Sequence, residues 1–332
     1  MSICLGCLKD KKLNNNNYCV KCIKELFDGI VPKELDFDKN EFYIQRDKLA
    51  SRMSISGVQD KISLKFENST LITTATNGRY ILKPIPSSSH IKNKDDVIFN
   101  EHLSMLISKE IFKIPTASCG LIKFNDGEMA YITKRFDYEL SSDLKYDQED
   151  FASILDVSSA KDGANYKYDA KTYIDCANAI KLNVSASVVV LEDFFKRILL
   201  NYLISNGDAH LKNFSLYSLS SFNDYMLTPN YDILNTRYHI DEKYGDMALD
   251  LMDDFTATYE AIGYYTYADF ALFARYLNIQ DIRFNKIINI INSSLPKVIN
   301  LVKNSFLSHS AKEYYIASYQ DRLKRIHYKI TN

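Results

Sequence analysis

The sequence predicts an α+β fold in which a small cysteine-rich module comes first, a strand-rich segment follows and a mostly helical half ends the chain. Three observations support this order. Residues 62–66 alternate strictly between apolar and polar side chains, as a half-buried strand does. From Leu191 onward, apolar residues recur at helical spacing. Four cysteines lie within the first 22 residues. With 332 residues, the chain is long enough to bury two cores.

The first part of the chain contains two C-x-x-C pairs, Cys4 with Cys7 and Cys19 with Cys22. Each pair can hold a metal ion from a tight turn, and four thiolates complete the tetrahedral coordination of structural Zn²⁺. Two disulfides are the alternative, which the polar flanks and the lack of a secretory signal disfavour. A segment this short cannot bury a core unaided. We therefore interpret residues 1–30 as a zinc knuckle- or ribbon-like module that gains its folding energy from the metal.

A connector and a strand-rich segment are expected next. Residues 31–51 are rich in Asp, Lys and Glu and are predicted to connect the module to residues 52–146. That segment begins with residues 54–61 (SISGVQDK), a small-residue turn that leads into the strand at 62–66. A Ser/Gly loop between strands can bring backbone N–H groups close to phosphate oxygens. Only one glycine is present, so the sequence is not that of a P-loop.

A second predicted strand, residues 79–84, carries Lys83 near its end. A lysine at this place suits pairing with the α and β phosphates of a nucleotide, and a solvated lysine at the strand end is the alternative. Asn100 and Glu101 are expected to open the helix that follows. Glu101 would then either hold Lys83 by an ion pair, as in kinase folds, or favour the helix N-terminus electrostatically.

The second half, residues 147–332, is predicted to be mostly helical. Its first long helix covers 191–203 and stops at Asn206-Gly207, after which residues 214–217 resemble a short strand. Apolar stripes over 279–306 and 311–330 predict further helices, with a kink or a helix start at Pro296.

The loop between that helix and that strand places an acid and an amide five residues apart, at Asp208 and Asn213. In phosphotransferases, an Asp so placed orients the attacking hydroxyl and accepts its proton, while the Asn holds Mg²⁺. The alternative is a capped helix end in which Asp208 bonds local backbone. Asp232 could supply the second Mg²⁺ carboxylate, or could be a turn residue. His210 would position Asp208 or a phosphate, or would pack the loop.

The order of these motifs resembles the HipA family of bacterial toxin kinases from about residue 50 to residue 330. Only about fifty residues precede the Ser/Gly loop, so the chain is most similar to the compact, HipT-like members, whose missing N-terminal subdomain is a separate small protein. The motifs that carry the resemblance are 54–61 (SISGVQDK), 81–84 (ILKP), 100–101 (NE), 134–137 (KRFD), 149–152 (EDFA), 206–213 (NGDAHLKN) and 231–232 (YD).

The resemblance implies a remote protein-kinase-like, two-lobed fold, with residues 52–146 as the N-lobe and 147–332 as the C-lobe. It implies Asp208 as the catalytic acid, with Glu101 and His210 in support. It implies two Mg²⁺ ligands, Asn213 and Asp232. The positions implied to contact ATP are Lys83, the hinge residues Glu149 and Phe151, and the loop residues Ser56, Gly57 and Val58.

The resemblance also implies a function, a serine/threonine kinase that acts as the toxin of a toxin–antitoxin system. The implied substrate class is a translation component such as an aminoacyl-tRNA synthetase, and the implied partner is a small, DNA-binding antitoxin. Self-phosphorylation is implied at Ser54, with Ser56 as a second candidate, and its negative charge would repel the ATP phosphates and switch the enzyme off. A small-molecule or lipid kinase and a catalytically dead binding module are the alternatives.

Composition fits an ordinary globular protein, with 46% hydrophobic and 25% charged residues and a net charge of −1. A balance this close to neutral argues against direct nucleic-acid binding. No apolar run approaches the length of a membrane span, and neither terminus resembles a targeting peptide, so the cytoplasm is the expected location.

Overall fold

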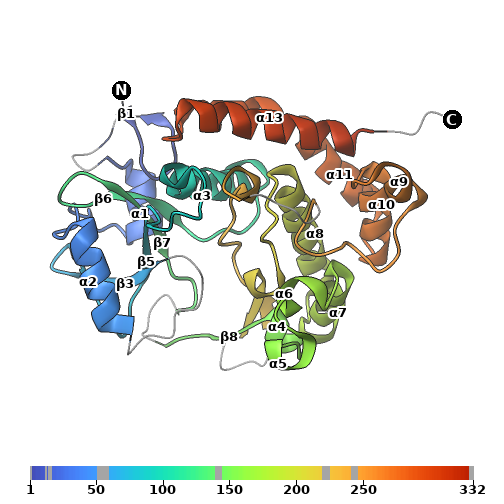
Figure 1. Ribbon diagram of the computed structural model, residues 1–332, viewed down its shortest axis with the longest axis horizontal. Helices are drawn as coiled ribbons and strands as arrows, with labels where there is room; N and C mark the ends of the chain where they lie inside the picture. The colour runs from blue at the N-terminus through green and yellow to red at the C-terminus, as the bar shows by residue number, and fades with distance from the viewer. Residues whose placement is uncertain are drawn as a thin grey trace.

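The computed structural model describes residues 2–11, 13, 17–50, 60–138, 144–218, 225–240 and 246–328. A part built on an antiparallel sheet lies at one end of the molecule, and a helical part lies at the other (Figure 1). The last helix, α13 (His309–Ile326), runs along the top of that view from above the first part toward the second. The predicted α+β, two-lobed fold is confirmed.

The first part is a five-stranded antiparallel sheet in the order β4-β3-β5-β7-β6. Helix α3 follows a 3₁₀ turn, continues into a π-helical turn and packs on β6 and β7. The elements are β3 (Ile62–Glu67), β4 (Thr70–Thr73), β5 (Tyr80–Pro84), η1 (Lys94–Asp96), α3 (Val97–Leu106), η2 (Ile107–Ile111), β6 (Cys119–Lys123) and β7 (Met129–Lys134).

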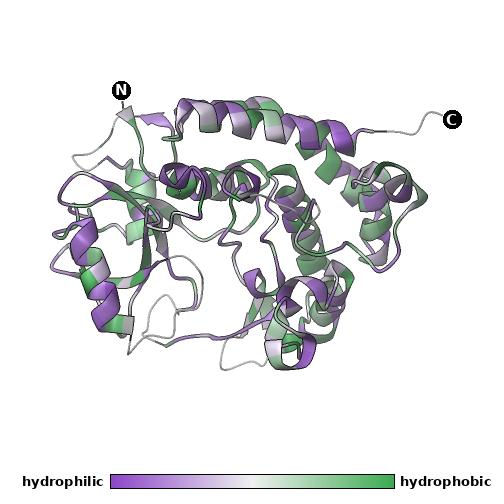
Figure 2. Ribbon diagram, viewed as in Figure 1, coloured by the Kyte–Doolittle hydropathy of each residue, from purple (hydrophilic) through white to green (hydrophobic). Residues whose placement is uncertain are grey.

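Before the sheet come a two-stranded knuckle and two helices: β1 (Ser2–Ile3), β2 (Asp10–Lys11), α1 (Val20–Phe27) and α2 (Lys39–Ala50). The segment predicted as a connector is more structured than expected. It contains α2, and it buries Leu35, Phe37 and Phe42 in the same core as the sheet. Part of its charge lies on the exposed side of α2, at Glu41, Asp47 and Lys48, and this helix is mostly hydrophilic in Figure 2.

The helical part begins with a small sheet in the order β10-β9-β8, which places the loop after α8 beside the chain that enters from the first part. The predicted helix over 191–203 is confirmed as α8, and Pro296 lies in the first turn of α12. The elements are β8 (Asp147–Asp150), α4 (Phe151–Ile154), α5 (Ser159–Asp162), α6 (Tyr166–Asp169), α7 (Tyr173–Asn183), α8 (Ser187–Leu203), η3 (Leu211–Asn213), β9 (Ser215–Ser218), β10 (Tyr225–Leu227), η4 (Thr236–Tyr238), α9 (Ala257–Ile262), α10 (Tyr267–Tyr276), α11 (Asp281–Asn292) and α12 (Leu295–Asn304).

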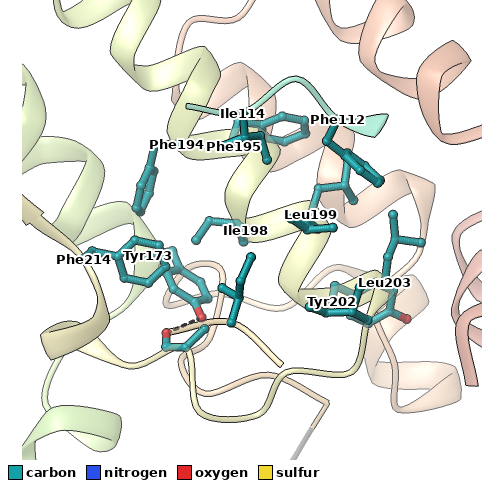
Figure 3. Packing of buried hydrophobic residues seen from close by; sticks show 14 of the residues in the cluster. Phe112, Ile114, Tyr173, Phe194, Phe195, Ile198, Leu199, Tyr202, Leu203 and Phe214 are labelled. Carbon is teal, nitrogen blue, oxygen red and sulfur yellow. Dashed lines mark hydrogen bonds between the residues drawn. The ribbon is translucent and has the colours of Figure 1, made fainter. Parts of the chain in front are cut away.

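Two apolar cores hold the chain together, one around α8 and one between the cysteine module and the sheet. In the first, Phe194 and Ile198 of α8 point at Tyr173 and Phe214, and all four are fully buried (Figure 3). The Phe194 and Phe214 rings meet edge to face with centroids 5.4 Å apart, a favoured aromatic geometry. Burying a side chain of this size contributes about 1.5–3 kcal/mol. This core fixes the end of α8 and the loop that follows.

Candidate active site

The loop that follows α8 is fixed by hydrogen bonds from distant parts of the helical half. The backbone N–H of Gly207 donates to Thr236 Oγ1 at 2.8 Å. The hydroxyl of Tyr173 donates to the carbonyl of Ala209 at 2.8 Å, the bond drawn dashed in Figure 3. The Asp208 side chain between them is 45% exposed. A rigid backbone with an accessible carboxylate is what a group that must meet a substrate hydroxyl requires.

Asn213 is oriented by the same loop. Its Nδ2 donates to the backbone carbonyl of Asp208 at 2.7 Å. This bond uses the amide nitrogen and leaves the oxygen Oδ1 as the atom able to bind a cation, and Mg²⁺ prefers oxygen ligands. The five-residue spacing between acid and amide therefore has a structural cause, because η3 turns the chain back on itself.

Lys83 bridges two carboxylates from different elements. Its Nζ donates to Glu101 Oε1 at 2.7 Å and also to Asp232 Oδ1. Burial alone would lower the pKa of Lys83, but the charges of Asp232 and Glu101 outweigh it and raise that pKa above its usual value. The charge of Lys83 in turn lowers the pKa of Asp232. Lys83 and Asp232 thus each favour the charged form of the other, and the cluster joins β5, α3 and the segment after β10.

The helix that supplies Glu101 begins earlier than predicted. α3 starts at Val97, so Glu101 lies in its second turn rather than at its first residues. The helix N-terminus is therefore not what Glu101 interacts with. Its side chain is 2% exposed and ion-paired to Lys83, the geometry of the Lys–Glu pair in kinase folds. Desolvation raises the pKa of Glu101, which the nearby charge of Lys83 opposes.

Asp232 is held in an unusual backbone conformation. Its φ is +57°, in the left-handed region that costs a residue other than glycine about 1–3 kcal/mol unless its surroundings impose it. The neighbouring Tyr231 imposes it in part, because its hydroxyl hydrogen-bonds with Ser215 Oγ at 2.8 Å and its ring lies 5.4 Å from that of Phe136. This conformation turns the carboxylate toward Lys83.

A cavity of about 190 Å³ opens beside this ion-pair cluster. The lining combines apolar and aromatic side chains with charged ones, the mixture expected of a ligand-binding site. Its lining includes Lys61, Ile81, Thr133, Phe136, Gln148 and Tyr231. Lys61 closes the motif at 54–61, and burial lowers its pKa.

The predicted hinge residues lie beside this cavity rather than in its lining. Glu149 is exposed on β8, where it pairs with Leu216 of β9. Phe151 is fully buried, and its backbone N–H donates to the carbonyl of Phe214 at 3.0 Å. Of this segment, Gln148 is the residue that reaches the cavity. The expectation that adenine binds here stays a prediction, and Ser54, Ser56, Gly57 and Val58 lie outside the described residues.

Two residues at the site carried no sequence signal. Lys167 and Tyr168 come from the short helix α6, about forty residues before the loop. Lys167 Nζ donates to His210 Nε2 at 2.9 Å, and the Tyr168 hydroxyl donates to Asp208 Oδ1 at 2.5 Å. Burial lowers the pKa of His210, which the charge of Asp208 and, more weakly, that of Asp232 oppose. A neutral imidazole can accept the bond from Lys167.

The four cysteines of the first module converge. Their sulfur atoms all lie within 4.8 Å of one another, and Cys7 Sγ and Cys19 Sγ are 3.9 Å apart. A tetrahedral ion with Zn–S bonds of about 2.3 Å requires sulfurs roughly 3.8 Å apart, so the set fits structural Zn²⁺. These separations are far from the 2.03–2.05 Å of a disulfide. The backbone N–H of Cys19 donates to Cys4 Sγ at 3.2 Å, as expected for a bound thiolate.

The cysteine module is bonded to the sheet and to α3. The backbone N–H of Leu121 donates to the carbonyl of Leu5 at 3.0 Å, and the Tyr18 hydroxyl donates to the carbonyl of Leu121. His102, next to Glu101 on α3, hydrogen-bonds through Nε2 with the carbonyl of Gly6 at 3.1 Å. The module thus touches the helix that carries one partner of the Lys83 ion pair.

The fold and the site together define a class. A sheet and one helix supply a buried Lys–Glu pair, and a helical part supplies an Asp/Asn loop and a second acid, which is the arrangement of protein-kinase folds. The family model for the HipA-like C-terminal domain matches residues 53–299. The chain belongs to this family, and the predicted resemblance is confirmed.

Two curated relatives of this chain are named as kinases. A "Putative kinase" of Haemophilus influenzae is 31% identical over 246 residues, which cover 71% of this chain and 68% of that protein. The "Putative kinase Y4dM" of Sinorhizobium fredii is 28% identical over 220 residues, covering 61% of this chain and half of that protein.

Solved structures share the fold. HipA of Shewanella oneidensis, in a complex with HipB and operator DNA, superimposes with a TM-score of 0.61 at 18% identity, covering 88% of this chain and 70% of that one. The proinflammatory kinase CtkA of Helicobacter pylori gives 0.54 at 15% identity, covering 88% of this chain and 93% of that one. Among the residues that the structure describes, no helix has the length and apolar character needed to cross a membrane.

Proposed function

We propose that the chain is an ATP- and Mg²⁺-dependent serine/threonine protein kinase. The observation that carries the proposal is the ion-pair cluster of Lys83, Glu101 and Asp232 at a cavity. The loop with Asp208 and Asn213 lies next to this cluster, because the hydroxyl of Tyr231, the neighbour of Asp232, donates to the carbonyl of Lys212 at 3.4 Å. A fold kept for binding alone has no need for this full set of charged groups, several of which are costly to bury.

Each residue has a role in phosphate transfer that its contacts support. Lys83, held by Glu101, binds the α and β phosphates of ATP. Asn213 and Asp232 are the oxygen ligands that would hold Mg²⁺, which supplies charge neutralisation on the β and γ phosphates when bound. Asp208 orients the hydroxyl of the substrate and accepts its proton.

We further propose that the kinase is the toxin of a toxin–antitoxin system. This rests on membership of the HipA-like family and on the likeness to a HipA that was solved with HipB and operator DNA. The substrate class would be a translation component such as an aminoacyl-tRNA synthetase, and the partner a small antitoxin that binds DNA. Phosphorylation of Ser54 or Ser56 would place about −1.5 to −2 charges beside the ATP phosphates and inhibit the enzyme.

Labelled ATP and a whole-cell lysate test the kinase activity. The native chain should label itself and a small set of proteins, whereas Asp208→Ala should lose roughly 10²–10⁴-fold in rate, the usual contribution of a general base. Asp254→Ala is a control, because that acid is exposed on the same helical half. Label found in a metabolite or lipid but in no protein would show a small-molecule kinase. Equal activity of native and Asp208→Ala would refute the catalytic role.

A further inference from the structure

The hydroxyl of Tyr168 is hydrogen-bonded to Asp208, the residue proposed above as the general base. During transfer, a general base must be within hydrogen-bond reach of the proton that it accepts. Tyr168 meets this condition on Asp208 Oδ1 at 2.5 Å, with the tyrosine as donor. The ring is fixed at this place by its edge-to-face contact with His210, with centroids 5.0 Å apart. The chain thus presents one of its own hydroxyls to its own base.

The chemical state of this hydroxyl fits the role of an acceptor. Burial, and then the hydrogen bond to Asp208, raise the pKa of Tyr168, so the phenol keeps its proton. Asp208 therefore faces a protonated oxygen, as it would with serine or threonine. Lys167, the preceding residue, holds its Nζ 4.8 Å from the centre of the Tyr168 ring, so a cation lies close to the acceptor.

We propose that Tyr168 is a phosphate acceptor within its own chain, a modification site that rests on the kinase function proposed above. The phenolic oxygen of Tyr168 forms a bond to the γ-phosphorus of ATP. The bond from that phosphorus to the β,γ-bridging oxygen breaks, and ADP leaves with its electron pair. The phenolic proton passes to Asp208. The products are phosphotyrosine at position 168 and ADP.

The modification would change access to the catalytic carboxylate. A phosphotyrosine carries about −1.5 to −2 charges at neutral pH and cannot remain against the anionic Asp208. α6 would therefore leave the loop, with Lys167 as the adjacent partner for the new phosphate. Asp208 Oδ1, which the Tyr168 hydroxyl occupies before the modification, would then be available to the hydroxyl of another protein. Self-modification at Tyr168 is in this way a step that opens the acceptor site.

The attachment of α6 permits such a movement. The helix is a single turn, and the segment 159–165 before it is exposed at every position. Gly163 within that segment has φ +85°, a conformation that lets the chain reverse sharply. Segments with few buried contacts open at a small cost in free energy compared with the core.

Phosphosite mapping tests the proposal on the full-length protein. Native chain, Tyr168→Phe and Tyr166→Phe are dephosphorylated, incubated with Mg²⁺ and ATP, and mapped by tandem mass spectrometry. Tyr166→Phe is the matched control, because it makes the same change on the same helix. We expect phosphate on Tyr168 in the native and control chains, with a first-order rate constant that does not change with protein concentration. Tyr168→Phe should carry one phosphate fewer per chain.

Three outcomes would overturn the proposal, and they differ in what they leave standing. If Ser54, Ser56 or another residue of the chain is phosphorylated while Tyr168 stays unmodified, the acceptor role is wrong and the kinase function remains. An apparent first-order rate constant for Tyr168 modification that rises with protein concentration would show transfer between chains, which contradicts the geometry. If the native chain transfers no phosphate to anything, the proposed function fails together with the inference.

Discussion

Replacing Phe27 with alanine tests whether the cysteine module and the kinase sheet form one cooperative core. Phe27 ends α1, is fully buried and meets the rings of Tyr18, Phe66 and Tyr80 at 5.1, 6.0 and 5.9 Å. Two of these rings belong to the sheet. Truncating a buried phenylalanine costs about 3–5 kcal/mol. An unfolding entropy of about 2.1 cal/mol/K per residue gives roughly 0.7 kcal/mol/K for this chain, so Tm should fall by about 4–7 °C.

Calorimetry with the metal-loaded protein measures this shift. Val20→Ala is the control, because Val20 lies on the same helix with 68% of its surface exposed, and it should change Tm by less than about 1 °C. A new early transition in Phe27→Ala, with the main transition unmoved, would show that the module unfolds separately. That result would refute the reasoning that its aromatic core is shared with the sheet.

The remaining predictions concern charge and metal. Burial lowers the pKa of His102 to about 4 from an unfolded value near 6.5, so the unfolded chain binds a proton that the folded chain does not; about 3 kcal/mol of stability should be lost as pH falls from 6.5 to 4. Urea titrations across this range should show a smaller loss in His102→Gln, and equal slopes would contradict the assignment. Glu101→Gln should lower the free energy of unfolding by about 3 kcal/mol and weaken ATP binding, because a buried pair loses one charge while Lys83 keeps Asp232. Urea titration measures the first effect and isothermal titration with ATP the second, and Glu128→Gln, at an exposed pair, should change neither. An unchanged ATP affinity would count against the role of the ion pair. Removing Zn²⁺ with a chelator should lower Tm and kinase activity together, because α3 is bonded to Gly6; activity that survives complete removal, checked by elemental analysis, would disprove this coupling.

Sequence patterns predicted those features of the structure that depend on residues close together in the chain. The apolar stripe of α8, the Asp208 and Asn213 spacing and the two C-x-x-C pairs each specify a structure within a short stretch of chain, and each is found in the structure. Charge patterning did not indicate the contacts that long-range packing makes. The segment 31–51 appeared to be a charged connector, yet its few apolar residues enter the shared core.

Contacts between distant segments could not be predicted from the sequence. The bond from Tyr168 to Asp208 joins residues forty positions apart, and neither α6 nor its flanks carry a motif. The start of α3 was placed three residues late, because Val97 follows directly on a 3₁₀ turn without a side-chain cap to mark it. Tertiary packing, rather than a local signal, sets both features.

The docking of the cysteine module on β6 has a consequence for solubility. β6 is the last strand of its sheet, and a strand at a sheet margin offers unpaired N–H and C=O groups that can recruit a second molecule. Leu5 and Tyr18 take up both backbone groups of Leu121 at the middle of that strand. The module therefore covers the middle of this strand edge, and a module that unfolds for lack of its metal would leave these backbone groups open to pairing with a second molecule.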